Sequence, residues 1–262
     1  MAEPSLQTNC ERQMTILQVK NLCKAFGGLR AVDQVTMEVY QSEILGLIGP
    51  NGAGKTTLFN LITGFLTPDD GHVFFNGEEF TNLKPHVICR LGIARTFQIP
   101  RPLTSLSVLE NIAIGALVRN LSYGRACEEA TQVARRVGLE NKLRIRAGDL
   151  TIGDKKRLGF AQALATKPQL LLLDEIASGI TPTEVDQLLA IIRSVVDEGV
   201  TVVMVEHVMR AVMNISTRVV VLDHGKLIAE GAPAEIVNNQ AVIEAYLGEE
   251  YARREGGTNQ DA

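Results

Sequence analysis

The sequence lacks the features of a membrane-spanning chain and of a cysteine-based zinc centre. A spanning helix needs about 20 consecutive apolar residues, whereas the apolar runs at 170–173 and 202–205 have the length of strands. The four cysteines form no Cys-x-x-Cys pair and have no histidine at zinc spacing, which predicts reduced, mostly structural thiols. Residues 1–14 are polar and contain no signal-peptide segment, so we expect the chain to fold in the cytoplasm.

An excess of positive charge is also missing. The 26 basic and 30 acidic residues give a formal net charge of −4, so the chain has no broad basic field. This balance argues against nucleic acid as a partner and against electrostatic docking on anionic lipid. What is present is ordinary for a globular protein: 45% hydrophobic and 21% charged residues over 262 positions. That length allows one large α/β domain, with or without an inserted lobe.

Strand and helix patterns alternate along most of the chain. From about 98 to 168 the strand signals fade and helical patterns replace them, which indicates a helical lobe inserted into an α/β core. Apolar strands that alternate with helices predict a mainly parallel sheet covered by helices. The expected strands are 15–19, 35–39, 44–48, 170–173 and 201–205, with hairpins at 72–77 and 218–229, a turn at 68–71 and helices at 55–62, 127–137 and after 153.

Two capping boxes mark the starts of further helices. Ser107 and Glu110 form the first, and Thr181 and Glu184 form the second, with Pro182 at the first helical position. We expect the second of these helices to end at Gly199 and to turn one apolar face to the core. The residues of that face are Val185, Leu188, Leu189, Ile192 and Val196.

A phosphate-binding loop is the strongest motif. Residues 49–56 fit G-x-x-x-x-G-K-[ST], with an apolar strand before them and a helix after them. The glycines let backbone N–H groups approach phosphate, and the helix directs its positive end to the same place. Lys55 is expected to reach the β- and γ-phosphates, and the Thr56 hydroxyl to bind Mg²⁺. The predicted nucleotide-binding residues here are Gly49, Pro50, Asn51, Gly52, Ala53, Gly54, Lys55, Thr56 and Thr57.

Two acids follow the apolar strand 170–173, at the sheet edge where open α/β folds bind ligands. Asp174 is expected to hold Mg²⁺, usually through water, and Glu175 to orient or deprotonate an attacking water. Gln98 is a candidate to touch both Mg²⁺ and that water, and His207 a candidate to donate a hydrogen bond to the γ-phosphate. Taken alone, Gln98 and His207 are more often structural.

Phe26 precedes Gly27-Gly28 and is a candidate to stack on the base, although an aromatic residue near a turn is more often part of the core.

The order of all these parts along the chain resembles that of the ATP-binding subunits of ABC transporters, over about residues 17–248. The resemblance implies a P-loop NTPase core with a mainly parallel sheet, an antiparallel β portion near the N-terminus and the inserted helical lobe. It implies that 95–98 is the Q-loop, 150–154 the Leu-Ser-Gly-Gly-Gln signature, 179–182 the D-loop, His207 the switch histidine and Phe26 the adenine-stacking residue.

The resemblance narrows to branched-chain amino acid importers, and within them to the larger ATPase subunit. The segments 26–32, 92–98, 205–207 and 245–248 carry it. It implies ATP and Mg²⁺ as cofactors, a second ATPase subunit, two permease subunits and, indirectly, a periplasmic solute-binding protein. The place of such a subunit is the cytoplasmic face of the inner membrane. Related importers carry urea, amides or aromatic acids, so the sequence leaves the solute open.

The predicted domain plan is a flexible tail at 1–14, one ABC ATPase domain at 15–252 with its helical lobe at about 98–168, and a flexible tail at 253–262. The part of the lobe just after Gln98 is where this family grips its membrane subunits. We therefore expect a membrane-facing groove near Pro100, Pro102, Leu103 and Leu106.

Several positions depart from the family pattern. The signature keeps Gly153, but it has Thr151, Ile152 and Asp154 where Ser, Gly or Tyr, and Gln or Glu are common. Asp154 would weaken contact with a polyphosphate unless it points away, and Lys155, Lys156 and Arg157 are candidates to offset its charge. Ile176 replaces a proline, and Thr181 replaces the Asp or Asn of the D-loop.

In this family two subunits sandwich two ATP molecules, and each signature faces the ATP on the partner's loop. The predicted signature contacts, made by Thr151, Gly153 and Asp154, are therefore with the partner's ATP. An asymmetric heterodimer with unequal hydrolysis rates is one hypothesis, and a homodimer and a weakly hydrolysing ATP-binding subunit are alternatives. A soluble GTPase would need Asn-Lys-x-Asp, which does not occur here, and a soluble kinase would not explain the order of the parts.

Overall fold

The computed structural model describes residues 14–119, 121–207 and 209–246. Nearly all of the two predicted tails lies outside these residues, as do Leu247 and Gly248 of the C-terminal segment that carried part of the resemblance. Among the described residues, no helix has both the length and the apolar character needed to cross a membrane.

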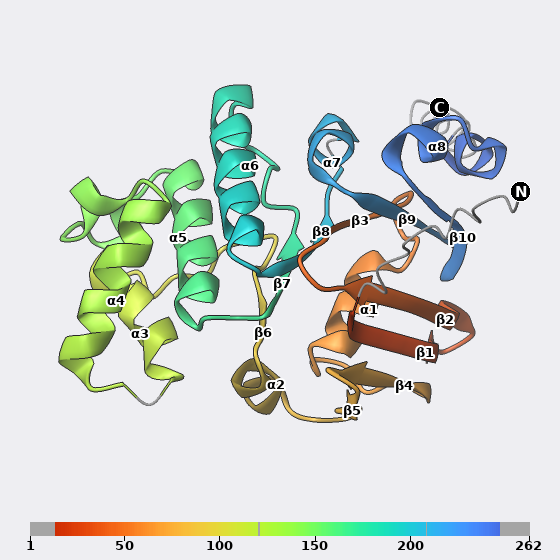
Figure 1. The fold of residues 1–262 in the computed structure, drawn as a ribbon, viewed down its shortest axis with the longest axis horizontal. Coiled ribbons are helices and arrows are strands. Elements are labelled where there is room, and N and C mark those ends of the chain that lie inside the picture. The colour runs from red at the N-terminus through yellow and green to blue at the C-terminus, as the bar shows by residue number, and fades with distance from the viewer. Residues whose placement is uncertain (1–13, 120, 208, 247–262) are drawn as a thin grey trace, which may run out of the picture.

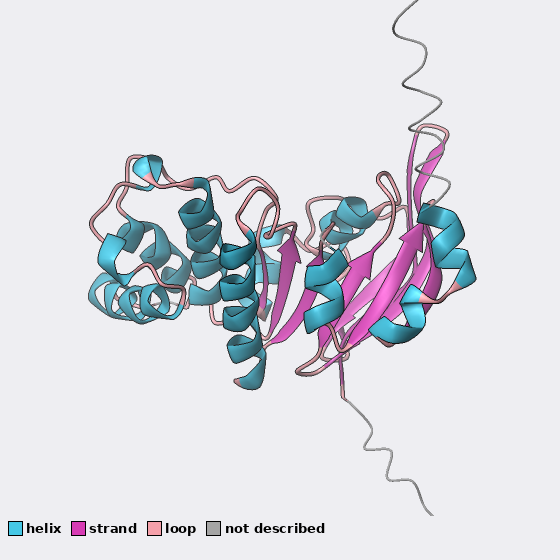
Figure 2. Ribbon diagram, turned by 90° about the horizontal axis from the view of Figure 1, so that it is seen from above, coloured by secondary structure: helices cyan, strands magenta, loops and turns pink. Residues whose placement is uncertain are grey.

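Two sheets form the core of the molecule (Figures 1 and 2). The first is antiparallel, with the strand order β2-β1-β4-β5. The second has the order β10-β9-β3-β8-β7-β6, and all its strand pairs are parallel except β10 with β9. The strands are β1 (Thr15–Phe26), β2 (Leu29–Tyr40), β3 (Ile44–Ile48), β4 (Asp70–Phe75), β5 (Glu78–Glu79), β6 (Ile93–Arg95), β7 (Leu170–Asp174), β8 (Thr201–Val205), β9 (Arg218–Asp223) and β10 (Lys226–Gly231).

Three helices gather at one end of the molecule, at the left of Figure 1. They are α3 (Val108–Leu117), α4 (Tyr123–Arg136) and α5 (Ile152–Ala165), and the 3-10 turns η1 (Glu140–Lys142) and η2 (Ala147–Asp149) join α4 to α5. The expected fold class is thus confirmed in its three parts: a mainly parallel sheet, an antiparallel β portion and a helical lobe. The remaining helices are α1 (Lys55–Ile62), α2 (Pro85–Leu91), α6 (Pro182–Asp197), α7 (Met209–Ile215) and α8 (Pro233–Val237).

Strand β7 shows why the parallel sheet lies in the centre. All its residues are buried, as they are in β3 and β8, which is the pattern of strands covered on both faces. Leu171 and Leu173 belong to the core that includes the helical lobe. Leu170 and Leu172 belong to the core formed with α1 and the antiparallel sheet. Alternate leucines therefore pack the strand between two halves of the protein.

The antiparallel strands are longer than the sequence predicted. β1 runs on to Phe26 and β2 starts at Leu29, because the two strands pair along their lengths through several register shifts. Such irregularities break the apolar alternation on which a strand prediction depends. The predicted turn at 68–71 was wrong in part, since β4 already begins at Asp70, which pairs with Cys23.

Both capping boxes are present. The Ser107 hydroxyl accepts from the Glu110 amide at 3.2 Å, and the Thr181 hydroxyl accepts from the Glu184 amide at 3.3 Å. In α6 the predicted core face is confirmed, with Leu188, Leu189 and Ile192 buried and Val185 and Val196 partly buried. α6 ends at Asp197, two residues before Gly199.

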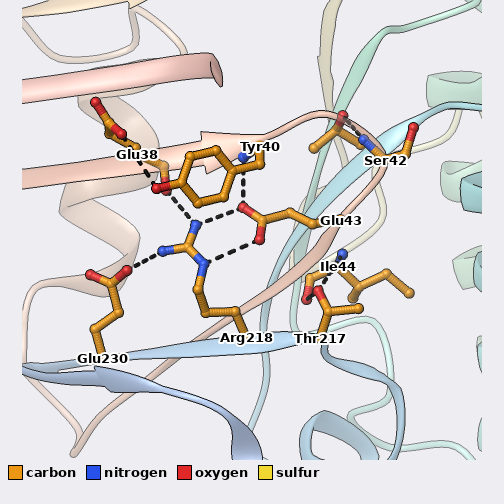
Figure 3. A network of polar contacts seen from close by, with 9 residues as sticks. Glu38, Tyr40, Ser42, Glu43, Ile44, Thr217, Arg218 and Glu230 are labelled. Carbon is orange, nitrogen blue, oxygen red and sulfur yellow. Dashed lines mark hydrogen bonds and ion pairs between the residues drawn. The ribbon is translucent and has the colours of Figure 1, made fainter. Parts of the chain in front are cut away.

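Arg218, at the start of β9, ties the two sheets together (Figure 3). Its guanidinium makes a bidentate contact with Glu43, at 2.7 and 3.2 Å, and donates to the Glu38 carbonyl at 2.6 Å. It also pairs with Glu230 and lies over the Tyr40 ring, 4.7 Å from its centroid. Glu38 and Tyr40 belong to β2, so one cation connects the antiparallel sheet to the parallel one.

Candidate functional site

The phosphate loop connects β3 to α1, and its backbone requires glycine. Gly49, Gly52 and Gly54 have φ values of +151°, +78° and +105°, which favour a residue without Cβ. A Cβ on Gly49 would lie 1.9 Å from the Leu222 carbonyl oxygen, and one on Gly54 would lie 2.2 Å from that of Ala31. The loop is thus held close against two neighbouring backbones.

Lys55 is buried at the first position of α1. Its ammonium donates to the carbonyl oxygens of Gly49 and Pro50 at 2.7 and 2.8 Å. No side chain caps the helix at Gly54. A cation and the N-terminus of a helix therefore point to the same place, an arrangement suited to phosphate.

Gln98, Glu175 and His207 come together, as their order in the chain suggested. Gln98 Nε2 lies 2.5 Å from Glu175 Oε2, and His207 Nε2 lies 2.5 Å from Glu175 Oε1. The Glu175 side chain is almost buried, whereas His207 is 44% exposed. The carboxylate thus holds two groups, one from the segment after β6 and one from the end of β8.

These three side chains face the phosphate loop. Gly49 and Asn51 line a cavity of about 970 Å³ together with Gln98, Glu175 and His207. The rest of its lining comes from α7, α8 and the helical residues 240–246. Apart from Arg210 it is mostly apolar, with Met209, Met213, Ile236, Val242 and Tyr246.

Asp174 has a partner that the sequence did not indicate. Its carboxylate pairs with Arg95 at 2.6 Å, and both side chains are about 95% buried. Arg95 also donates to Asn60 at 2.6 Å and to Thr63 at 3.3 Å. Arg95 stood within the segment compared with the Q-loop, but nothing in the local pattern marked it as the partner of a residue 79 positions away.

The predicted Mg²⁺ residues share a second cavity. Thr56, Gln98 and Asp174 all line a space of about 860 Å³ beside the helical lobe. Each offers an oxygen donor, and Mg²⁺ prefers oxygen ligands and is bound by few protein groups when phosphates and waters complete its shell. Within the described residues no cluster of three or more His, Cys, Asp or Glu side chains is placed to hold a metal. The donor set therefore fits a magnesium ion that enters with a nucleotide.

Phe26 stands apart from both cavities, since it is absent from their linings. It ends β1 at the hairpin to β2 and is 49% exposed. The ammonium of Lys24 lies 5.8 Å from its ring centroid. An exposed aromatic face beside a cation is available for stacking on a planar base.

The signature starts α5 with a reciprocal cap. The Thr151 hydroxyl accepts from the Asp154 amide at 3.2 Å and donates to the Asp154 carboxylate at 2.9 Å. Lys142 donates to the same carboxylate at 2.5 Å. Burial alone would raise the pKa of Asp154, but the hydrogen bonds from Lys142 and Thr151 outweigh it and hold the pKa below its usual value. The Asp154 carboxylate is thus ionised, and the positive charge of Lys142 balances its negative charge.

The basic residues that follow Asp154 do not lie where the sequence suggested. Lys155 donates to the Gly148 carbonyl at 2.9 Å, and Lys156 donates to the Glu175 carbonyl at 2.8 Å. Only Arg157 adds a favourable charge effect at Asp154, and its guanidinium hydrogen-bonds to Gln187. The expected offset was therefore wrong for Lys155 and Lys156, whereas Arg157 contributes to it and Lys142 contributes most.

The signature does not join the phosphate loop of its own chain. Thr151, Gly153 and Asp154 line neither of the two cavities around that loop. Gly153 lies tightly against α6, where a Cβ would come within 2.5 Å of Glu184 Oε1. A ligand bound at the loop would thus lie apart from the signature of the same chain.

Glu206 is a buried acid that the sequence did not single out. It is 2% exposed, and one carboxylate oxygen accepts from the Ala177 amide at 2.8 Å. The other oxygen is buried without a hydrogen-bond partner. Burial raises the pKa of Glu206 to about 7. A polar residue after an apolar strand gives no sign of this burial, since many such residues are exposed.

Comparisons with known proteins extend these observations over most of the chain. Residues 32–178 match the family "ABC transporter", and residues 226–252 match "Branched-chain amino acid ATP-binding cassette transporter". The high-affinity branched-chain amino acid transport ATP-binding protein LivG of Escherichia coli is 39% identical over 252 residues, covering 89% of this chain and 98% of the relative. The protein of the same description from Pseudomonas aeruginosa, BraF, is 39% identical over 250 residues, with the same coverage of 89% and 98%.

Solved structures show the same fold. A nucleotide-free ATP-binding cassette from an ABC transporter aligns with a TM-score of 0.82 at 32% identity, over 89% of this chain and 99% of the other. A cassette in its ADP conformation also gives 0.82 at 32% identity, over 90% and 100%.

Proposed function

Because this chain belongs to the ABC transporter family of ATP-binding proteins, we propose that it hydrolyses ATP as the energy-coupling subunit of a branched-chain amino acid importer. One observation carries the catalytic part of the proposal. Glu175, Gln98 and His207 meet on the cavity that the phosphate loop also lines. The solute is proposed from the similarity to branched-chain amino acid transport proteins and from the C-terminal match at 226–252.

ATP would lie across the phosphate loop, with its base at Phe26. The loop amides and Lys55 would bind the β- and γ-phosphates, and Thr56 and Thr57 would continue that contact at the start of α1. Lys55 now donates to two loop carbonyls, so phosphate oxygens would replace those acceptors. Mg²⁺ would be held by Thr56, Gln98 and Asp174 and would neutralise part of the phosphate charge.

Hydrolysis would depend on how the contacts of Glu175 are exchanged. Gln98 and His207 both occupy its carboxylate in this structure. We propose that His207 leaves Glu175 to donate to the γ-phosphate, which opens a position for water. Glu175 then accepts a proton from that water while Gln98 orients it, and Lys55 stabilises the charge that spreads over the phosphate oxygens.

The second half of each ATP site would come from another subunit. Gly153 and Thr151, at the start of α5, would face ATP on the partner's loop. Asp154 does not oppose this contact, because its carboxylate is held by Lys142 and Thr151. We propose a heterodimer with a second ATPase subunit, in which this signature tunes hydrolysis at the partner's loop.

Permease subunits would dock beside the helical lobe and hold the chain at the cytoplasmic face of the inner membrane. The 860 Å³ cavity has apolar walls there, including Phe65, Phe97, Ile99 and Pro100, and the first three are about half or more exposed. Leu103 is 49% exposed as well. Exposed apolar side chains around a hollow are typical of a protein-binding surface. Of the four residues predicted for this groove, Pro100 lines the cavity, whereas Pro102, Leu103 and Leu106 are absent from its lining.

The test is ATP turnover in the transporter purified through a tag on this chain and placed in lipid nanodiscs. We expect two permease subunits and a second ATPase to copurify, and Glu175→Gln to reduce turnover at least about a hundredfold while ATP binding persists. The matched control is Glu198→Gln, at an exposed acid that directly follows α6.

Unchanged turnover in Glu175→Gln would refute the catalytic role. The solute is tested separately, by uptake of labelled leucine and of labelled urea in cells that lack the chain. Restoration of urea uptake without leucine uptake would refute the proposed cargo and leave the ATPase assignment standing.

A further inference from the structure

Glu175 adopts a backbone conformation that the surrounding residues must stabilise. Its φ is +48°, a left-handed value that is costly for a residue other than glycine and persists only where neighbours hold it. Its amide donates to the Val205 carbonyl at 2.8 Å. Its carbonyl accepts from the Lys156 ammonium at 2.8 Å and, more weakly, from the Ser178 amide at 3.4 Å. The charged donor from Lys156 is thus the strongest contact on that carbonyl.

Lys156 is buried to an unusual degree for a lysine, with 7% exposure. Desolvation lowers its pKa, while the nearby carboxylates of Glu206 and Glu175 act in the opposite direction. Neither carboxylate forms an ion pair with it within 4 Å in the described structure. Burial of an ammonium group destabilises the protein unless the group is paired or hydrogen-bonded. Here its hydrogen bond goes to the main chain of the catalytic residue.

Helix α5 gives this contact its significance. It begins at Ile152, immediately before Gly153, and carries Lys156 one turn further on. A helix is stiff over a single turn, so a shift of the signature end moves Lys156 with it. That shift would change the position of the Glu175 carbonyl, which belongs to the same residue as the carboxylate that Gln98 and His207 contact.

We propose that Lys156 is a positioning residue that makes the geometry of Glu175 depend on the position of α5. The signature of this chain contacts the ATP that the partner's loop holds. Through Lys156, that contact controls Glu175, the catalytic carboxylate for the ATP that this chain's own loop holds. The inference rests on the proposed function, because it needs ATP at the signature. It assigns to one buried side chain the link between the two sites.

The test compares Lys156→Met with Lys155→Met in the assembled transporter in nanodiscs, with ATP as the varied substrate. Lys155 is a matched control because it lies on the same turn and also donates to a main-chain carbonyl, that of Gly148. We expect Lys156→Met to lower kcat at least about tenfold with KM changed less than about twofold. We expect its Hill coefficient to fall from above 1 to about 1, and Lys155→Met to behave like the wild type.

A second variant separates positioning from simple charge burial. Lys156→Met leaves Glu206 without a nearby cation, so a loss of activity has two explanations. Lys156→Met/Glu206→Gln removes the charge problem and restores stability, but the Glu175 carbonyl still lacks its donor. We expect this double variant to fold and to remain slow.

Three outcomes would overturn the proposal. They are full recovery of kcat in the double variant, equal kcat in Lys156→Met and Lys155→Met, and a wild-type Hill coefficient of 1. A wild-type complex without ATP turnover would instead refute the proposed function. Thermal unfolding of each complex confirms that the compared samples are folded.

Discussion

Replacing Arg218 by methionine tests the link between the two sheets. Methionine keeps the apolar stem and removes every hydrogen bond of the guanidinium. Glu43, which is 6% exposed, would keep its bond from the Tyr40 amide at 2.7 Å and lose both bonds from Arg218. The Glu38 carbonyl would lose its donor as well. The change therefore leaves a buried carboxylate without a counter-ion.

The magnitude follows from these contacts. Breaking a buried pair by removal of one partner costs about 3–5 kcal/mol. The contact with Glu230 adds little, because that side chain is 47% exposed. Since Arg218 itself keeps 16% exposure, we take the lower end, about 3 kcal/mol. At roughly 2–4 °C per kcal/mol for a chain of this size, the Tm should fall by about 6–12 °C.

Thermal unfolding of the isolated chain, followed by circular dichroism, measures this change. The control is Arg136→Met, because the pair of Arg136 with Glu198 is exposed and should contribute less than about 1 kcal/mol. The double variant Arg218→Met/Glu43→Leu removes both charges and should recover most of the loss. A fall in Tm below about 2 °C for Arg218→Met, or equal losses in the single and double variants, would refute the argument.

Three further predictions concern the site. Phe26→Ala should weaken ATP binding about tenfold, because stacking on a base contributes on the order of 1–3 kcal/mol; titration calorimetry measures it, and unchanged affinity would contradict the adenine contact. Lys142→Met should raise the KM for ATP of the assembled transporter about threefold to tenfold by freeing the Asp154 carboxylate, and Lys142→Met/Asp154→Gln should reverse this effect in the same steady-state assay. The pKa of Glu206 is raised to about 7 from the ordinary 4.5, so its contribution to folding is fully present below pH 4.5 and is lost as the pH rises through 7. In urea unfolding, the free energy of unfolding of Glu206→Gln should therefore rise by about 2–3 kcal/mol relative to that of the wild type between pH 5 and 8. A difference between the two proteins that stays constant with pH would contradict the shift in pKa.

Local sequence was enough to predict the parts whose geometry is set within a few residues. The loop at 49–56 needs its glycines for backbone reasons that are nearly independent of the rest of the fold. The capping boxes at Ser107 and Thr181 are likewise complete within four residues. The order of Gln98, Glu175 and His207 predicted their meeting because parallel strands bring their carboxyl ends to one edge.

The partners of charged side chains were not predictable in the same way. Asp154 pairs with Lys142, 12 positions away and in another element. The direction in which the Asp154 side chain points could therefore not be predicted from the signature alone. Lys155, Lys156 and Arg157 are adjacent letters, yet they point to three different partners because the helix rotates each one to a new side. Sequence indicates which charges are present, and only the packing of elements decides which of them meet.

The alternation at the end of β8 sets a limit on which length changes the chain can accept. Directly after β8, Glu206 is buried and the next residue, His207, is 44% exposed, so one position separates a buried acid from an exposed imidazole. Deleting one residue within 201–205 would move the imidazole into the buried position of Glu206 and the acid into the buried position of Val205. The turn before β8, where Gly199 has a φ of +98°, carries no such constraint. Homologues that align across this region should therefore differ in length at 198–200 and be free of gaps from 201 to 207.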